Sequence, residues 1–362
     1  MEKIRILAIN PGSTSTKISV FHGEEEVFTE NIVHDYEELK KFKNVVEQEG
    51  YRYEAILRVL EAKGFSLDEI DVVAARGGIT RPVKAGTYRI NDLMLEDLRN
   101  AVGGEHASNV SAFIAQKISK EKGIPAFIVD PVSVDEMEDV ARISGLEGIE
   151  RKSLSHALNI RRVVYKVAGK HGKTPAELNF IVAHLGGGIS IAAIRKGRMV
   201  DVESANCEGP FSPERTGGLP ILELVDLCFS GKYTKDEIKR KLIQEGGIYS
   251  YLGTKDVKEV EERAKSGDKK AALILDAMVY QIAKCIGEMA TVLKGEVDYI
   301  VLTGGIAKSD YICESISERV KFIAPVERVP GEEEMKALAE AACRVMAGNE
   351  EVLDYGEVKG DV

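Results

Sequence analysis

Apolar segments that end in glycine-rich turns recur along this chain and predict two sets of β-strands. Near the start, Ile4–Ile9, Thr16–Phe21 and Glu26–Val33 follow one another closely, so we expect an antiparallel meander. The same plan returns in the second half, with strands at Phe180–His184, Ser190–Arg195 and Arg198–Glu203. A pattern that occurs twice predicts a duplicated domain.

Segments with helical periodicity lie between and after these strands. Helices are predicted at Tyr53–Lys63, Asn91–Ala101, Ser108–Lys122, Ser155–His171, Leu219–Phe229, Lys255–Ala264, Lys269–Lys294 and Glu333–Ala347. Further buried strands are predicted at Asp71–Ala75, Pro125–Val129 and Tyr299–Leu302. Strands mixed with crossover helices indicate an α/β protein. The final helix has an apolar face that we expect to pack on the first domain.

Length and composition narrow the class of protein. A chain of 362 residues exceeds one compact core, and 44% hydrophobic residues exclude wholesale disorder. A net charge of -10 disfavours nucleic acid as a partner. Because no apolar run is long enough to span a membrane and no signal peptide precedes Met1, we expect a soluble, cytoplasmic protein. The five cysteines are scattered, so we predict no zinc site or disulfide framework and expect each in the core.

Three glycine turns carry the candidate chemistry. Asn10–Lys17 combines Gly12 with consecutive hydroxyls and a lysine, Gly186–Gly188 interrupts two strands, and Gly304-Gly305-Ile306 follows a third. Glycine lets backbone amides approach a ligand closely, and hydroxyls add donors, so such turns hold phosphate oxygens. One such turn alone could be an ordinary hairpin, but the three together predict a nucleotide site. Gly172-Lys173-Thr174 resembles the end of a P-loop, yet it follows a helix and lacks the earlier glycine, so it is a loop.

Charged residues and histidines cluster around the same turns. His184 directly precedes the triple glycine, Arg215 lies in a Pro/Gly-rich loop, and Arg76 follows a buried strand. A planar arginine fork in a fixed loop suits a developing phosphoryl charge. The other candidates are His106 in a glycine-rich helix entry, Asp130 at a strand end, and the run Glu332–Glu334. Asp130 could equally be a turn residue, and acids are favourable at a helix N-terminus in any case. We expect the remaining His22, His34 and His171 at the surface and His156 at the start of a helix.

The set of motifs resembles the acetate kinase/butyrate kinase group of the actin-like ATPase superfamily, which includes sugar kinases, heat-shock chaperones and actin. The matching pieces are Ile9–Lys17, Ala183–Gly188, Glu214–Gly218, Thr303–Ile306 and Pro330–Glu333, in the same order over nearly the whole chain. Finer details are similar to the butyrate kinase branch, at Arg76–Pro82, Gly104–Asn109 and Pro330–Met335.

This resemblance implies two ribonuclease H-like domains with the nucleotide in the cleft between them. We expect an acyl-site lobe of residues 1–175, completed by 332–362, and a nucleotide-binding lobe of residues 176–331. The implied catalytic residues are Arg215, His184, Asp130, Arg76 and His106. The implied nucleotide-binding residues are Gly12, Ser13, Thr14, Lys17, Gly186, Gly187, Gly188, Gly304, Gly305 and Ile306. Asn10 and Glu332 are implied to support Mg²⁺.

Three positions depart from the family pattern. Acetate kinases have a histidine four positions before the one that matches His156, and here that position is Lys152. The family's second arginine aligns with Val73, so we name Arg76 in its place, with Arg81 as the alternative. The residues after His106 are small, which implies a roomier acyl pocket.

The expected reaction is reversible transfer of the ATP γ-phosphoryl group to the carboxylate of a short-chain fatty acid, butyrate or isobutyrate. A carboxylic acid is already ionised at neutral pH, so no general base is needed. The alternatives are an acetate or propionate kinase, then a sugar kinase, then an actin-like or chaperone-like ATPase without a small acceptor. The resemblance and the apolar helix Lys269–Lys294 also imply a homodimer or higher homo-oligomer.

Overall fold

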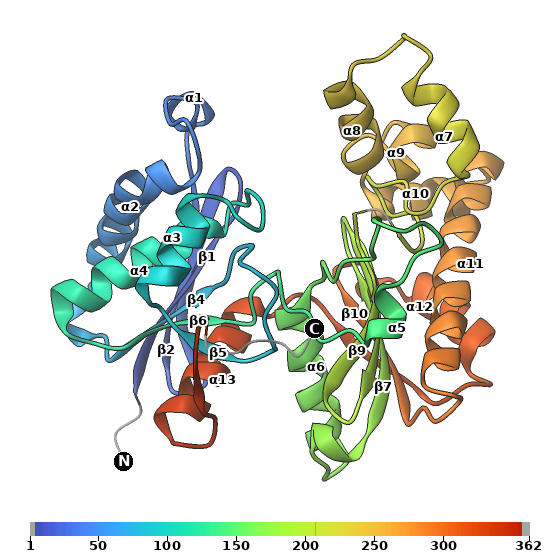
Figure 1. Cartoon of the computed structure of the whole chain (residues 1–362). Helices are drawn as coiled ribbons and strands as arrows, with labels where there is room; N and C mark the ends of the chain where they lie inside the picture. The colour runs from blue at the N-terminus through green and yellow to red at the C-terminus, as the bar shows by residue number, and fades with distance from the viewer. Residues whose placement is uncertain (1–3, 207, 357–362) are drawn as a thin grey trace. The chain divides into compact units, whose positions relative to one another are not determined.

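The computed structural model describes residues 4–206 and 208–356, which form two compact units. Unit 1 contains the chain up to Asp135, the segment Ala157–Asn159 and the C-terminal part from Glu333 onward. Unit 2 contains Glu136–His156 and Ile160–Glu332. Both units are α/β (Figure 1). From the sequence, we placed the boundary between the two lobes after residue 175. The structure assigns residues 136–156 and 160–175 to unit 2 instead.

Unit 1 is built on a seven-stranded sheet with the order β12-β5-β6-β4-β1-β2-β3. Its strands are β1 Arg5–Pro11, β2 Ser15–His22, β3 Glu25–Val33, β4 Val72–Arg76, β5 Thr87–Arg89, β6 Ala126–Val129 and β12 Val352–Asp354. The first three form the predicted antiparallel meander, and β4 runs parallel to β1 and β6. The short strands β5 and β12 were not predicted.

Helices cover both faces of this sheet. The helices of unit 1 are α1 Tyr36–Leu39, α2 Glu49–Ala62, α3 Asp92–Arg99, α4 Asn109–Lys122 and α13 Glu334–Met346. Alternate residues of β1 face opposite cores: Leu7 and Ile9 pack with α2, α3 and α4, whereas Ile6 and Ala8 pack with α13. The final helix therefore packs on the first unit, as the sequence predicted.

Unit 2 repeats the plan on a five-stranded sheet with the order β11-β10-β7-β8-β9. Its strands are β7 Asn179–Leu185, β8 Ile189–Arg195, β9 Arg198–Glu203, β10 Tyr299–Gly304 and β11 Val326–Pro330. As in unit 1, three strands form an antiparallel meander, and the next strand, β10, runs parallel to the first, β7. The predicted duplication is therefore present in the strand order.

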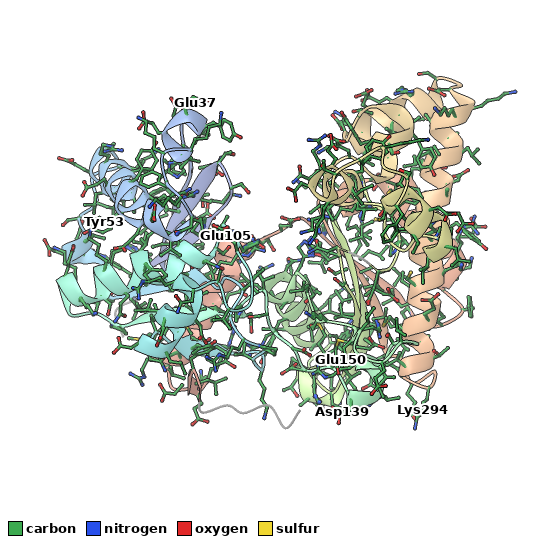
Figure 2. The ribbon with its side chains drawn as sticks, turned by 45° about the horizontal axis from the view of Figure 1, so that its top comes forward. Glu37, Tyr53, Glu105, Asp139, Glu150 and Lys294 are labelled. Carbon is green, nitrogen blue, oxygen red and sulfur yellow. The ribbon has the colours of Figure 1, made fainter. Side chains whose placement is uncertain are left out.

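The helices described in unit 2 are α5 Asp139–Arg142, α6 Ala157–Lys170, α7 Ile221–Cys228, α8 Lys235–Ile243, α9 Gly247–Leu252, α10 Val257–Lys265, α11 Lys269–Val292 and α12 Asp310–Val320. Of these, α6, α7, α10 and α11 were predicted, whereas α5, α8, α9 and α12 were not. The first turn of α6 belongs to unit 1. Helix α11 supplies the largest share of the core against β7 and β8. Asp139 and Glu150 belong to a segment near the Lys294 end of α11 (Figure 2). Within the described residues, no helix is long and apolar enough to cross a membrane.

Two predictions about single residues are wrong. His34 is buried with 4% exposure, because its ring makes a hydrogen bond to the buried hydroxyl of Thr16. Cys228 is exposed. It is the last residue of α7, and apolar residues of this helix are also exposed to solvent. Cys285 and Cys313 are in the core as expected, Cys343 is partly buried, and Cys207 lies outside the described residues.

Candidate active site

The triple-glycine turn joins β7 to β8 and leaves room for an arginine. A Cβ atom on Gly188 would collide with the guanidinium group of Arg215, so any larger residue would force this group to move. Gly186 donates its N–H to Gly188 O at 3.2 Å, and Ser212 donates its hydroxyl to Gly187 O. The loop that carries Arg215 is thereby fixed to the turn.

Arg215 is held by two acceptors through one nitrogen, and its other two guanidinium nitrogens make no hydrogen bond within the described residues. Its Nη1 donates to Ala205 O at 3.1 Å and to Asn206 Oδ1 at 2.9 Å. Its Nε is buried and has no hydrogen-bond partner in the described part of the chain. Burial lowers the pKa of the guanidinium, against the opposing effect of Glu214. A partly buried cation with unused N–H groups is suited to binding an anion.

His184 is fully buried at the end of β7 and touches two other side chains. Its Nε2 lies 3.1 Å from Glu332 Oε1. Its ring stacks on His156, with the ring centroids 3.8 Å apart and the planes 9° from parallel. His156 in turn lies 3.0 Å from Ser190 Oγ through its Nδ1. The imidazole of His184 is therefore fixed on its face and at its edge.

The end of β10 positions Glu332. Gly304 and Gly331 exchange backbone hydrogen bonds, Gly304 N to Gly331 O at 3.3 Å and Gly331 N to Gly304 O at 2.8 Å. Gly304 has a φ of +89°, and a Cβ atom there would collide with Leu185 O, so this position requires glycine. The paired glycines bring Glu332 beside β7, where it meets His184.

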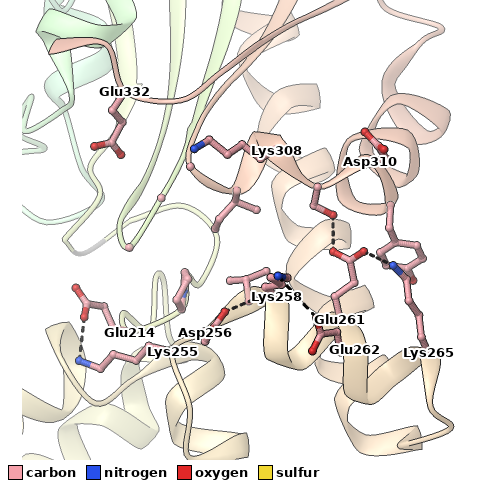
Figure 3. A pocket seen from close by; sticks show the side chains of 18 residues that line it. Glu214, Lys255, Asp256, Lys258, Glu261, Glu262, Lys265, Lys308, Asp310 and Glu332 are labelled. Carbon is pink, nitrogen blue, oxygen red and sulfur yellow. Dashed lines mark hydrogen bonds and ion pairs between the residues drawn. The ribbon is translucent and has the colours of Figure 1, made fainter. Parts of the chain in front are cut away.

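The predicted nucleotide turns of unit 2 line one cavity of about 740 Å³ (Figure 3). Five predicted residues line it: Gly186, Gly187, Gly305, Ile306 and Glu332. Lining residues that the sequence analysis did not single out are Pro213, Glu214, Lys255, Asp256, Val257, Lys258, Glu261, Glu262, Lys265, Lys308, Ser309, Asp310 and Tyr311. The volume is within the range of cofactor sites in proteins.

Most of the charged side chains that line this cavity are paired with a neighbouring side chain. Within the described residues, Lys308 is not. Lys255 pairs with Glu214 at 2.9 Å, and Glu261 accepts from Ser309 Oγ at 2.6 Å and from Lys265 Nζ at 2.7 Å (Figure 3). Among the residues that the structure describes, no carboxylate pairs with Lys308. The cavity therefore holds an ammonium group that is available to an anionic ligand.

In unit 1, the turn after β1 presents exposed polar groups. Gly12 donates its N–H to Ser15 O at 2.8 Å, which closes the turn. Ser13 and Thr14 are exposed at its tip, and Lys17 is exposed on β2. In the strand register Lys17 pairs with Asn10 of β1. The predicted residues of this turn therefore lie together at one end of the sheet.

Asn10 contacts a glutamate that the sequence analysis did not choose. Its Nδ2 donates to Glu334 Oε2 at 2.6 Å, and Arg76 Nη1 lies 3.3 Å from the same oxygen. Glu334 is largely buried at the start of α13. Arg81, the alternative to Arg76, instead forms a two-point ion pair with Asp97. Arg76 is thus the arginine that stands beside Asn10.

Asp130 and His106 occupy irregular backbone in unit 1. Asp130 follows β6 with a φ of +37°, an unfavourable conformation for a non-glycine residue, and accepts from Gly86 N at 2.7 Å. This bond matches the reading of Asp130 as a turn residue, although strained backbone is also common at active sites. His106 accepts from Ser108 N through Nδ1 at 3.1 Å, so the proton of the neutral ring lies on Nε2.

One further group has the composition of a metal site. Within the described residues, Glu203, Cys285 and Glu288 are the three His, Cys, Asp or Glu side chains that bring ligand atoms within 4.8 Å of one another. None of them was predicted. Lys152, which replaces a family histidine, is exposed.

Solved structures identify the fold. The acetate kinase of Porphyromonas gingivalis superposes with a TM-score of 0.78 at 20% identity, covering 94% of this chain and all of the other. A propionate kinase from Francisella tularensis subsp. tularensis SCHU S4 gives 0.77 at 17% identity, covering 93% of this chain and 98% of the other. These likenesses establish an α/β, two-domain fold of the actin-like ATPase kind.

Sequence relatives define the family. "Probable butyrate kinase 2" of Caldanaerobacter subterraneus subsp. tengcongensis is 52% identical over 352 residues, which are 97% of this chain and 99% of the relative. The acetokinase family profile matches residues 147–328. The chain belongs to the acetokinase family and is an ATP-dependent carboxylate kinase.

Proposed function

We propose that this protein is a butyrate kinase, which transfers the γ-phosphoryl group of ATP reversibly to butyrate or isobutyrate. The observation that carries the proposal is the convergence of Gly186, Gly305 and Glu332 on one cavity, next to His184. The high identity to a probable butyrate kinase over nearly the full chain supports the choice of acid.

We assign the phosphate-binding role to the glycine turns. Gly186–Gly188 and Gly304–Ile306 hold the nucleotide, together with Gly12, Ser13, Thr14 and Lys17 of the first turn. Glycine backbone lets amides approach a phosphate closely, because no side chain stands in the way. Lys308 provides a positive charge to the nucleotide phosphates.

Arg215 and His184 stabilise the phosphoryl group during transfer. Two anions must meet in this reaction, so catalysis consists of positioning and of charge stabilisation rather than proton removal. The Nη2 group of Arg215 makes no hydrogen bond in the described part of the chain, which supports its role, because an approaching phosphoryl oxygen can supply the acceptor. The stacked and hydrogen-bonded ring of His184 is held at a constant orientation.

The residues of unit 1 fit an acid-binding and Mg²⁺-binding role. Asn10 and Glu334 offer the oxygen ligands that Mg²⁺ prefers, and Glu332, which belongs to unit 2, is the alternative acidic residue. Asn10 uses its Nδ2 on Glu334, which leaves its Oδ1 available as a ligand. When bound, Mg²⁺ neutralises part of the phosphate charge. Arg76 neutralises the acid's carboxylate, His106 lines the acyl site, and Asp130 orients Arg76 or the metal.

A hydroxamate assay for acyl phosphate tests the substrate. The purified protein is incubated with MgATP and acetate, propionate, butyrate or isobutyrate, and kcat/KM is compared. We expect an optimum at the four-carbon acids, because each buried methylene contributes about 0.8 kcal/mol. An optimum at acetate or propionate would assign the enzyme to those kinases. ATP hydrolysis that no acid changes would indicate an ATPase without a small acceptor.

The proposal also covers the oligomeric state and the cellular location of the protein. We propose a homo-oligomer, because Ile221, Leu222 and Phe229 on and beside α7 are 74%, 76% and 86% exposed. Large apolar side chains grouped in solvent often mark a protein interface. We also propose a cytoplasmic location, where ATP is available.

A further inference from the structure

A fully buried arginine lies behind the turn that follows β1. Arg52, on α2, has 0% exposure, and its guanidinium group makes five hydrogen bonds. Two go to backbone carbonyls of the turn: Nη1 to Ser15 O at 2.8 Å and Nη2 to Ser13 O at 3.1 Å. The others reach Thr16 Oγ1 at 2.9 Å and Gln48 Oε1 at 2.9 and 3.0 Å. Every N–H of the guanidinium is used, so Arg52 has no donor left to contact a ligand.

These bonds orient the peptide groups of the turn. Ser13 O and Ser15 O point to Arg52, and Thr14 O accepts from His34 N at 2.9 Å. Because C=O and N–H point in opposite directions across a trans peptide, the Thr14 N–H points away from Arg52. In the described part of the chain, the amides of Ser13 and Thr14 have no acceptor. The turn therefore has its carbonyls satisfied from inside and two exposed amides unused.

The charge of Arg52 is not balanced by a carboxylate. All four of its acceptors are neutral groups: two carbonyls, a hydroxyl and an amide. Burial lowers the pKa of Arg52 to about 10, so it stays charged at neutral pH. His34 adds no charge, because burial and the charge of Arg52 lower its pKa to about 4. A buried cation without a counter-ion is costly, unless an anion binds nearby.

We propose that Arg52 is a positioning residue for phosphate binding: it holds the amide of Thr14 outward and supplies the charge that a phosphate at this turn neutralises. This inference rests on the nucleotide role proposed for the turn. It assigns to α2 a part in ligand binding, although Arg52 makes no contact with the ligand.

The test compares two substitutions of Arg52 with a control on the same helix. Arg52→Met removes charge and donors at similar length, and Arg52→Lys keeps the charge with fewer donors. Leu60→Ala, in the core two turns further along α2, lowers stability without touching the turn. ATP affinity is measured by calorimetry without any acid, and KM and kcat are measured with MgATP and butyrate, all below the melting temperature of each variant.

We expect Arg52→Met to weaken ATP binding about 10- to 100-fold, the range for hydrogen bonds to a charged group, with the KM for butyrate changed less than about threefold. Arg52→Lys should recover most of the loss, and Leu60→Ala should bind ATP as the wild type does. Wild-type affinity in Arg52→Met, or equal losses in Arg52→Met and Leu60→Ala, would overturn the inference, and a lysine variant as weak as the methionine variant would overturn the role of charge.

Two further comparisons test the inference if Arg52→Met does not fold or if the wild type phosphorylates no acid. If Arg52→Met does not fold, Gln48→Leu removes the acceptor of two of the five bonds, and we expect a loss of about 3- to 10-fold in ATP affinity; no loss would overturn the inference. If the wild type phosphorylates no acid, the proposed substrate is wrong, but the ATP affinities of the Arg52 series still test the role of Arg52.

Discussion

The rings of His156 and His184 are stacked face to face, 3.8 Å between centroids, and the outer ring lies 3.0 Å from Ser190 Oγ. His184 is the only one of the two with 0% exposure. Its orientation thus depends on a neighbour from another element, because His156 precedes α6 whereas His184 ends β7. Glu332 fixes the remaining edge of the ring.

We expect His156→Ala to lower kcat about 10- to 100-fold, the effect of a small misplacement of a catalytic group, with little change in the KM for ATP. His184→Ala should cost more, since it removes the group itself. Steady-state kinetics with MgATP and butyrate provide the measurement. His171→Ala, at a partly exposed histidine paired with Glu327, is the control. Full activity in His156→Ala would show that the stack does not position His184.

Arg215→Ala should reduce kcat at least about 10³-fold, the lower range for arginine stabilisation of a phosphoryl-transfer transition state. The Nη2 donor, which makes no hydrogen bond in the described part of the chain, is the group we expect to act on the phosphoryl oxygens. Arg240→Ala removes a surface ion pair with Glu245 in the same unit and should leave kcat unchanged. A loss of less than tenfold in Arg215→Ala would exclude a central role.

Glu334→Gln should raise the Mg²⁺ concentration for half-maximal activity about 10- to 100-fold, because Glu334 orients Asn10 and can itself bind the metal. Glu332→Gln, made in parallel, tests the residue expected from the sequence. Glu340→Gln on the same helix is the control. An unchanged Mg²⁺ requirement in both Glu334→Gln and Glu332→Gln would remove this end of α13 from the metal site.

Glu203 gives the stability of the fold a pH dependence. Burial raises its pKa from 4.5 to about 7, so the native protein keeps this proton up to about pH 7, whereas the unfolded chain loses it near 4.5. This contribution to stability is therefore fully present below about pH 4.5 and is lost as the pH rises to 7, for a total of about 3 kcal/mol at most.

Urea unfolding between pH 4.5 and 8 measures this contribution. Glu203→Gln cannot ionise, so its stability should fall less over this range and should exceed that of the wild type at pH 8. Glu318→Gln, at an exposed residue of α12, should follow the wild-type curve. Parallel curves for Glu203→Gln and the wild type would mean that the carboxyl group titrates normally.

The sequence predicted features that glycine or periodicity determines locally. Three consecutive glycines marked the turn at Gly186–Gly188, and apolar segments bounded by turns marked the strands of both meanders. The strand β11 was missed because Glu327 and Arg328 interrupt its apolar residues. Helix α2 was predicted to begin at Tyr53, since no side chain caps its true start, and Arg52 was therefore not considered.

Other features depend on which neighbours meet in the fold. Glu332, Glu333 and Glu334 are identical in sequence, and only the start of α13 decides that Glu334 faces Asn10. The sequence did contain one indication that Glu334 faces inward. Glu334 and the apolar Leu338 are one helical turn apart, so they lie on the same face of the helix. His34 seemed exposed among polar residues, but the buried Thr16 and Arg52 determine its environment.

The space that Arg215 occupies exists because Gly188, on a different segment, has no side chain. We therefore expect these positions to vary together, because a side chain at position 188 would force the guanidinium group to move. A homologue with alanine at the position of Gly188 is expected to have a shorter residue in place of Arg215, so that the two changes are inherited together.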